Sequence, residues 1–254
     1  MNRETTWRFI PLLEASGQVQ MAVDKWLFHQ HRQGLHPPTL RFYTWSPVAI
    51  SLGYHQKRYP SHWSNLTWHS KSIDLVRRPT GGRAVLHQGD LTYMVVCSGF
   101  FGHFNHVYQQ ICEFLIQGWR SLGVELHYGQ AERGYIHHPN CFATATNADL
   151  VDQHNNKFIG SAQLRQGNNI LQHGSMVLNP DNNLFEQVFN CSPPKVNLPF
   201  SHFNFETISV IIDTLIKSAC QCFNIDLIYQ PLSDSEWQQI KIFYDFLGIE
   251  ALIL

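Results

Sequence analysis

Apolar residues repeat along several long segments with the spacing of an amphipathic helix. In residues 16–31 and 104–122 they recur three and four positions apart, which places them on one face of a helix. The same spacing occupies residues 205–223, directly after Asn204, a residue type that caps helix N-termini. A last helix is expected to begin near residues 233–235.

Shorter apolar or alternating runs lie between these helices and predict strands. One strand is expected to begin at Leu40, and others lie in "VAISLGY" and Ile73–Arg77. The runs at 84–86 and 91–96 are expected to pair around the "HQGD" turn. A longer hairpin is predicted in "KFIGSAQLRQGNNILQHGSMVLN", with a first strand to about Gln163, a turn at 167–169 and a second strand at 170–178.

Helices and strands alternate irregularly, which predicts an α+β fold with a mixed central β-sheet flanked by helices. The 254 residues, of which 44% are hydrophobic, are enough to bury a core without disulfides. We expect one domain over residues 1–254, with a C-terminal helical portion from about residue 205. The Pro- and Asn-rich segment at 179–204 is interpreted as a link to that portion.

Composition excludes several classes of protein. The formal net charge of −1 gives no overall field for nucleic acid or an anionic membrane. No run approaches the ~20 apolar residues of a membrane span, and the N-terminus has no apolar signal-peptide core. Six scattered cysteines without a CxxC pair indicate reduced thiols, so a cytoplasmic protein is expected.

The stretch "RRPTGGRAVLH" concentrates charge and glycine between two predicted strands. Glycine permits a sharp turn and close approach of the backbone to a ligand. Strand alternation directs Arg77 and Arg78 to opposite faces, so at most one of them faces a given pocket. A tight hairpin with solvated arginines explains the stretch equally well.

A second stretch, "KFIGSAQ", and the "QHGS" that follows the turn carry polar residues on the predicted hairpin. Small residues in a strand allow another group to approach its face. Taken alone, Lys157 reads as a surface lysine and His173 as a core histidine.

Cys141 follows Pro139 and Asn140 in a predicted loop, where a lowered thiol pKa makes a nucleophile. An inert, half-buried thiol is the alternative. His137 and His138 lie close by, but a fourth metal ligand at a standard spacing is missing, so a metal site is not expected.

In this order, and preceded by "VQMAVDKWL" and "PTLRFYTWSPVAISLGYHQ", these stretches resemble the biotin/lipoate A/B protein ligase superfamily from about Trp7 to Asn179. Lipoate ligases usually carry a third glycine where "TGGRAVLH" has Arg83. That variant, together with a cysteine in a "CF" context, is similar to the cysteine-dependent octanoyltransferases that share the lipoate-ligase fold.

The resemblance implies transfer of an octanoyl group from acyl carrier protein to a lysine of a lipoyl domain or of the glycine-cleavage H protein. It implies no cofactor, neither ATP nor a metal, and no nucleic-acid or membrane partner; a monomer is expected. Cys141 would form an acyl-enzyme by thiol exchange, a nearly isoenergetic step, and Lys157 would hold the acyl carbonyl. The implied substrate-binding residues are Arg78, Thr80, Gly81, Gly82, Arg83, His87, Gly160, Ser161, Ala162 and His173.

Other functions remain open at this point. An ATP-dependent lipoate-protein ligase is compatible with Lys157 and the glycine turn, whereas Arg83 and Cys141 argue against it. Octanoyl or lipoyl amidotransfer between proteins uses the same kind of cysteine. A homologue that binds an acyl group without catalysis is the third alternative. A biotin ligase is disfavoured because the sequence lacks the Arg-Gly repeat of that family. The chain departs from the octanoyltransferase pattern at one point, because it has no acid directly after "CF", where close relatives are expected to carry one.

Overall fold

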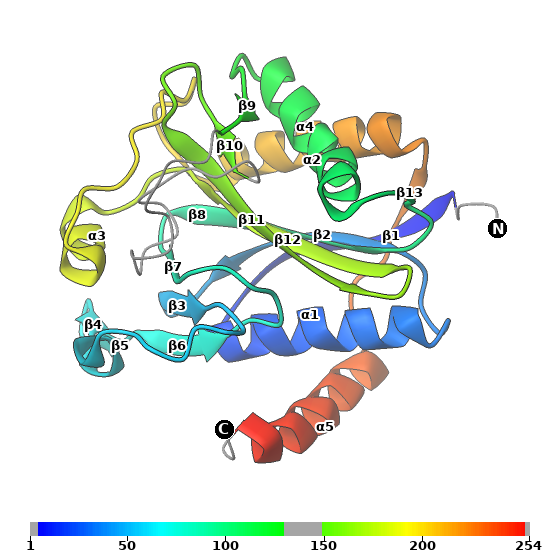
Figure 1. Ribbon diagram of the computed structural model, residues 1–254, viewed down its shortest axis with the longest axis horizontal. Coiled ribbons are helices and arrows are strands. Elements are labelled where there is room, and N and C mark those ends of the chain that lie inside the picture. The colour runs from blue at the N-terminus through cyan, green and yellow to red at the C-terminus, as the bar shows by residue number, and fades with distance from the viewer. Residues whose placement is uncertain (1–4, 130–148, 252–254) are drawn as a thin grey trace.

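The computed structural model describes residues 5–129 and 149–251, and it describes side chains in the last helix as far as residue 244. Its main feature is an eight-stranded mixed sheet with helices on both faces (Figure 1). The strand order is β13-β1-β2-β8-β12-β11-β10-β9. In chain order these strands are β1 (Thr6–Ala15), β2 (Thr39–Trp45), β8 (Asp90–Cys97), β9 (His127–Tyr128), β10 (Leu150–Val151), β11 (Lys157–Gln166), β12 (Asn169–Val177) and β13 (Asp226–Tyr229). The expected α+β fold is confirmed.

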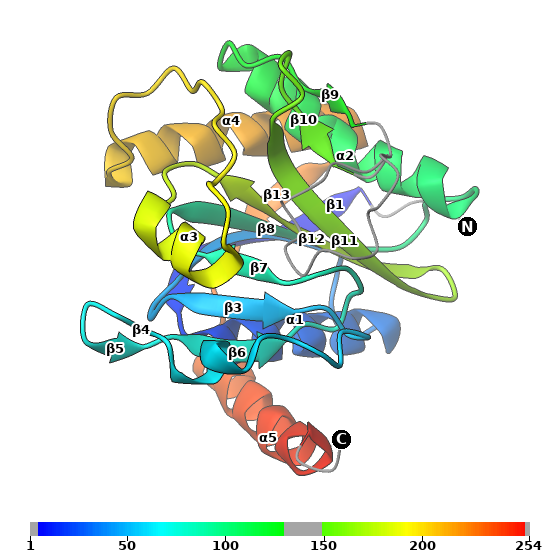
Figure 2. The ribbon, with the colours of Figure 1, turned by 60° about the vertical axis from the view of Figure 1, so that its left-hand side comes forward.

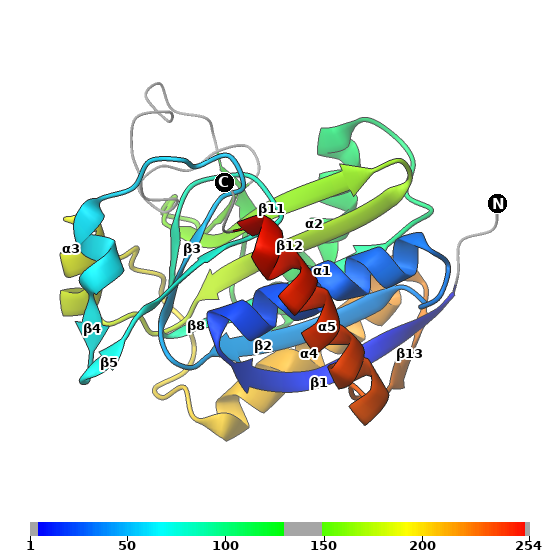
Figure 3. The same cartoon turned by 90° about the horizontal axis from the view of Figure 1, so that it is seen from below.

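Helices α2 (Phe104–Ser121) and α4 (Phe205–Phe223) cover one face of this sheet, and α1 (Gly17–Arg32) covers the other (Figure 1). Helix α5 (Asp234–Ala251) packs on the outside of α1, as the view from below shows (Figure 3). The two faces bury separate apolar clusters, one beneath α2 and α4 and one around α1. Within the described ranges, no helix combines the length and apolar character needed to cross a bilayer.

A second sheet has three strands in the order β6-β3-β7 and lies beside the N-terminal end of α1 (Figure 2). Its strands are β3 (Ala49–Leu52), β6 (Asp74–Arg77) and β7 (Val85–His87). A third apolar cluster joins this small sheet to α3 (Asn182–Phe189). The remaining short elements are a 3₁₀ helix at Ser61–Asn65 and the paired strands β4 (Thr67–Trp68) and β5 (Lys71–Ser72).

The predicted helices are confirmed, and three of them begin at side-chain caps, of which the sequence predicted the one at Asn204. The Ser16 side chain accepts a hydrogen bond from the Val19 amide at 3.4 Å at the start of α1. Asn204 does the same for Thr207 at 3.0 Å at the start of α4. In α5 the Ser233 amide donates to the Glu236 carboxylate at 2.7 Å, and the Glu236 amide donates back to the Ser233 hydroxyl at 3.3 Å. This reciprocal capping box sets the first turn of α5.

The expected pairing of β7 with β8 is wrong. β7 pairs with β3 in the small sheet, whereas β8 lies between β2 and β12 in the large one. Gly89, at φ +65°, carries the chain from one sheet to the other, and its carbonyl accepts bonds from the Leu178 and Asn179 amides. A side chain at Gly89 would meet the Asn179 carbonyl oxygen at 1.9 Å, so this crossing depends on glycine.

Two further expectations need correction. The segment expected to be a link, 179–204, contains α3, because Asp181 caps the Leu184 amide at 2.9 Å and the apolar side of the helix packs into the small-sheet core. The long hairpin is confirmed, but β11 continues past Gln163 to Gln166 because its pairing with β12 continues to Asn169.

Candidate active site

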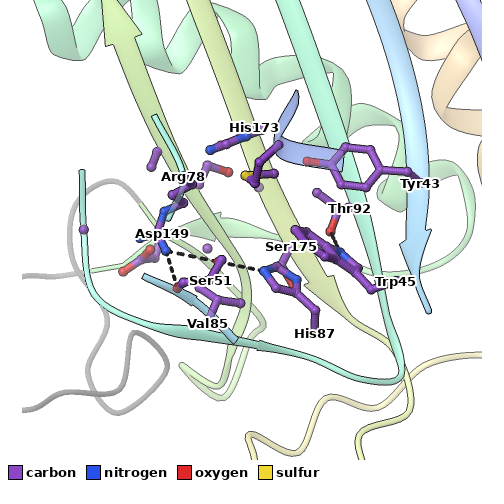
Figure 4. Close-up of a pocket in the computed structure, with 16 residues that line it drawn as sticks. Tyr43, Trp45, Ser51, Arg78, Val85, His87, Thr92, Asp149, His173 and Ser175 are labelled. Atoms are coloured by element: carbon purple, nitrogen blue, oxygen red, sulfur yellow. Dashed lines mark hydrogen bonds between the residues drawn. The ribbon is translucent and has the colours of Figure 1, made fainter. Parts of the chain in front are cut away.

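A pocket opens between the small sheet and the face of the large sheet that carries α1 (Figure 4). It measures about 580 Å³ including its opening to solvent. Its apolar wall is formed by Met21, Tyr43, Trp45 and Val85. Gly82, Gly160, Ala162 and Gly174 contribute little side-chain bulk to it. The polar side chains that line it are Ser51, Arg78, His87, Thr92, Asp149, Ser161, His173 and Ser175.

The glycine stretch forms a loop that Arg78 holds in place. The Arg78 guanidinium donates to the carbonyls of Gly81 at 2.8 Å, Arg83 at 2.6 Å and Ser51 at 2.8 Å. Gly82 has φ +92°, and a side chain at Gly53 would meet the Gly82 carbonyl oxygen at 1.8 Å. Arg78 therefore lines the pocket while its hydrogen bonds to these three carbonyls shape the loop.

Arg77 and Arg78 do face opposite ways. Arg77 is exposed and donates to the carbonyls of Gly53, Tyr54 and Gln56, whereas Arg78 is buried. The alternative of two solvated arginines is therefore wrong for Arg78.

His173 connects the glycine loop to α1. Its Nδ1 lies 2.8 Å from the Asp24 carboxylate, and its Nε2 lies 2.7 Å from the Thr80 hydroxyl. Asp24 also accepts from Arg41 at 2.8 Å and from the Tyr43 hydroxyl at 2.9 Å. Burial opposes ionisation of Asp24, but the Arg41 charge and the donors around the carboxylate outweigh it and hold its pKa below the usual range.

His87 occupies a second network at the small-sheet side of the pocket (Figure 4). Its ring nitrogens contact the Ser51 hydroxyl and the Asp90 carboxylate, each at 2.8 Å. Its ring stacks on Trp45 with centroids 3.8 Å apart and planes at 17°. Burial lowers the pKa of His87, and the neighbouring Asp90 offsets this only in part, so the imidazole is neutral near pH 7.

Lys157 is buried, so its interpretation as a surface lysine is wrong. It begins β11, and its ammonium lies 2.8 Å from the Asp149 carboxylate. Both side chains are about 95% removed from solvent, with 3% and 5% of their surface exposed. A buried ion needs such a partner, and Asp149 itself lines the pocket.

The small residues of β11 lie where the sequence predicts, on the pocket wall. Gly160, Ser161 and Ala162 all line it, and Ser161 accepts a hydrogen bond from the Tyr93 hydroxyl at 2.8 Å. Gly174 lies opposite Ser161 in the register of β12, and a side chain there would meet the Ser161 oxygen at 2.4 Å. The wall therefore depends on a glycine in β12 as well as on small residues in β11.

Not every expected site residue lies in the pocket wall. Thr80, Gly81 and Arg83 belong to the loop that Arg78 holds and are not among the lining residues. Cys141, with His137 and His138, lies outside the described residues. Within those residues, no group of three or more His, Cys, Asp or Glu side chains could hold a metal ion.

Sequence reasoning missed the carboxylates and the serine that complete these networks: Asp24, Asp90, Asp149 and Ser51. One signal was available for Asp24. It lies on the helix face that also carries Gln20, Leu27 and His31, all of them buried. A charged residue on the inward face of an amphipathic helix requires a buried partner. Asp90, Asp149 and Ser51 carry no comparable signal, because Asp90 begins β8, Asp149 directly precedes β10, and Ser51 lies in the four-residue strand β3.

Residues 16–200 match the family of the lipoyl protein ligase A/B catalytic domain. Proteins named octanoyltransferase LipM are similar over most of their length. That of Halalkalibacterium halodurans is 35% identical, over 83% of this chain and 79% of its own. That of Clostridioides difficile is 31% identical, over 94% and 95%. That of Bacillus subtilis is 34% identical, over 85% and 80%.

Solved structures share the fold. A lipoate-protein ligase A bound with ATP has a TM-score of 0.75 at 21% identity, over 94% of both chains. A bipartite lipoate protein ligase from Thermoplasma acidophilum, described with its E2 lipoyl domain, has a TM-score of 0.68 at 21% identity, over 96% of this chain and 93% of that one.

Proposed function

The chain belongs to the lipoyl protein ligase A/B family, and on that premise we propose that it is an octanoyltransferase of protein lipoylation. It takes octanoyl from acyl carrier protein and delivers it to a lysine of a lipoyl domain or of the glycine-cleavage H protein. The observation that carries the proposal is the likeness to octanoyltransferases over nearly the whole chain. The pocket supports it, because an eight-carbon chain needs an apolar slot and gains ~0.8 kcal/mol for each buried methylene.

The reaction on this proposal has two steps through Cys141. The Cys141 thiolate attacks the thioester carbonyl carbon, the carrier's C–S bond breaks, and the carrier thiol leaves with a proton. The amine of the acceptor lysine then attacks the acyl-Cys141 carbonyl carbon, the C–S bond to Cys141 breaks, and the Cys141 sulfur leaves with the proton that the amine gives up, so that an amide is formed. Because each thioester is already activated, neither step needs ATP.

Lys157 and the β11 backbone are proposed to assist at the acyl carbonyl. The Lys157 ammonium, held by Asp149 at the pocket wall, supplies positive charge where the carbonyl oxygen gains negative charge in the tetrahedral intermediate. Backbone N–H groups around Gly160–Ala162 are the further candidate donors. The pair with Asp149 keeps the lysine charged and in one place.

The surface beside the pocket suits an acidic carrier protein. Between Asp24 and Asp74 the sequence has no acid and, besides the buried Arg41, five Lys or Arg residues. Lys57 and Arg58 are exposed in the loop after Gly53, and that loop touches the glycine loop through the Tyr54 amide, 2.8 Å from the Thr80 carbonyl. Positive charge there steers an acidic partner toward the pocket.

The test is intact-protein mass spectrometry after mixing the protein with octanoyl-acyl carrier protein and no ATP. The proposal expects an octanoyl adduct that peptide mapping places on Cys141, that Cys141→Ala cannot carry there, and that passes to a lipoyl domain or H protein on addition. An acceptor modified only when ATP and free lipoate or octanoate are supplied, also by Cys141→Ser, would replace the proposal with an ATP-dependent ligase.

Charge reversal tests the carrier surface separately. In a Lys57→Glu/Arg58→Glu variant, kcat/KM for octanoyl-acyl carrier protein should fall about tenfold at low salt, and this deficit relative to wild type should shrink as salt is added. The rate with a small octanoyl thioester should not change. An equal loss with both substrates would refute the docking role.

A further inference from the structure

Ser51, His87 and Asp90 form a hydroxyl–imidazole–carboxylate line on the pocket wall. The Ser51 oxygen lies 2.8 Å from His87 Nε2, and His87 Nδ1 lies 2.8 Å from the Asp90 carboxylate. All three side chains are buried, and Ser51 and His87 line the pocket itself. These distances and this order are those of an activated nucleophile, its base and the group that orients the base.

The surroundings of Asp90 determine which His87 nitrogen carries the proton. The Asp90 oxygen that contacts His87 also accepts from Ser175 at 2.7 Å and from Thr92 at 3.2 Å, so it acts as an acceptor in this network. His87 Nδ1 therefore donates, and Nε2 presents its lone pair to the Ser51 hydroxyl. Stacking on Trp45 fixes the plane of the ring. A neutral, oriented imidazole is the state that a general base requires.

Arg78 adds charge at the serine oxygen. Its Nη1 lies 3.2 Å from Ser51 Oγ and 2.8 Å from the Ser51 carbonyl oxygen. A guanidinium at this distance favours the form of the serine oxygen that carries negative charge during attack. Arg78 and His87 both contact Ser51 at the pocket (Figure 4).

A second hydroxyl–imidazole–carboxylate line, Thr80–His173–Asp24, differs from the Ser51 line in the position of its hydroxyl and in the partners of its carboxylate. Thr80 is not among the lining residues, so its hydroxyl does not face the space where an acyl group would lie. Asp24 is shared with Arg41 and Tyr43, which ties this line to the core between α1 and the large sheet. It positions the loop, whereas the Ser51 line reaches the pocket.

We propose that Ser51 is a second acyl acceptor in this pocket and gives the protein an acyl-thioester hydrolase activity, a proposal that rests on the pocket's taking an octanoyl group. Ser51 Oγ attacks the carbonyl carbon, and its proton passes to His87 Nε2. The C–S bond breaks, and the leaving thiolate takes that proton, which leaves an octanoyl ester on Ser51 and a free thiol. Water, deprotonated by His87, then attacks the ester and releases octanoate and the serine hydroxyl.

The test uses Cys141→Ala, which removes the thiol of the transfer reaction, with p-nitrophenyl octanoate as the probe. The expected result is a burst of about one p-nitrophenolate per protein and one octanoyl adduct, as a covalent intermediate gives. Peptide mapping should place the adduct on Ser51, and neutral hydroxylamine should not remove it, because it is an oxygen ester. Adding His87→Gln should slow the burst by a factor of about 100 or more.

Three further variants in the Cys141→Ala background keep the test decisive. Ser51→Ala should abolish the burst. Ser51→Cys should make the adduct sensitive to hydroxylamine, and this variant tests the role of Ser51 even if Ser51→Ala does not fold. Ser98→Ala is the matched control, because Ser98 pairs with His31 at 3.2 Å outside the pocket lining, and its burst should be unchanged.

A Cys141→Ala protein with no burst, or with its adduct on another residue, would overturn the Ser51 proposal. If wild type is still acylated by octanoyl-acyl carrier protein, transfer through Cys141 stands without it. If neither protein is acylated, both proposals fail.

Discussion

Replacing Asp24 with asparagine tests how far the buried network around His173 supports the fold. The Asp24 carboxylate is wholly buried and accepts four hydrogen bonds, two from Arg41 at 3.0 and 2.8 Å, one from Tyr43 at 2.9 Å and one from His173 at 2.8 Å. Asparagine is nearly the same size, but it removes the charge and turns an N–H group toward Arg41 or toward His173. The Arg41 charge is then buried without its counter-ion.

Breaking one side of a buried ion pair costs about 3–5 kcal/mol. We therefore expect Asp24→Asn to lower the free energy of unfolding by about 4 kcal/mol at pH 7, a large part of the 5–15 kcal/mol of a typical protein. With an m-value near 3 kcal/mol/M, the urea midpoint falls by about 1.3 M. Asp213→Asn, at an exposed position on α4, is the matched control and should change stability by less than about 0.5 kcal/mol.

The direction of the Asp24 pKa shift determines how the stability difference between wild type and Asp24→Asn changes with pH. The pKa of Asp24 is lowered in the folded protein, so its contribution is complete above the unfolded value of 3.8 and is lost as the pH falls below it. The stability gap between wild type and Asp24→Asn should therefore be constant above that pH and narrow in stronger acid. A loss below about 1 kcal/mol at pH 7, or a gap that widens in acid, would refute the reasoning.

Three other perturbations follow from single contacts. Gly174→Val places a side chain against Ser161, whose oxygen lies 2.4 Å from the Cβ position. The variant should reduce octanoyl transfer at least tenfold in a thioester assay. Unchanged transfer would contradict the assignment of this pocket as the octanoyl site. The pKa of Glu236 is lowered to about 2: burial alone would raise it, but the hydrogen bond from Arg8 outweighs that. Stability at the α5 attachment should therefore be lost as pH falls from 4.5 toward 2, and Glu236→Gln should abolish that part of an acid-unfolding curve. Burial raises the pKa of Cys112 to about 12, so iodoacetamide at pH 8 should modify it only after unfolding; labelling of the native protein, read by peptide mapping, would contradict this.

The helices and the hairpin of this protein can be predicted from its sequence because they depend on residues that are close along the chain. Helix α4 begins and ends where the apolar spacing and the Asn204 cap predict, Phe205 to Phe223. The long hairpin has its turn at Gly167, which adopts φ +61°. Family membership is equally local, because short ordered motifs such as "TGGRAVLH" carry it.

What only the tertiary structure decided is which distant residues meet. From the sequence, the apolar run 84–86 is expected to pair with β8, but so short a run fits the edge of either sheet, and β7 pairs with β3 instead, with Gly89 at the turn between the two sheets. Asp24 and His173 are 149 positions apart and meet only because α1 packs across β12. The spacing of apolar residues predicts which side chains are buried, but it does not predict which residues they contact. A charged residue at a position predicted to be buried indicates that it has a partner. Only the packing of sheets and helices determines which residue that partner is.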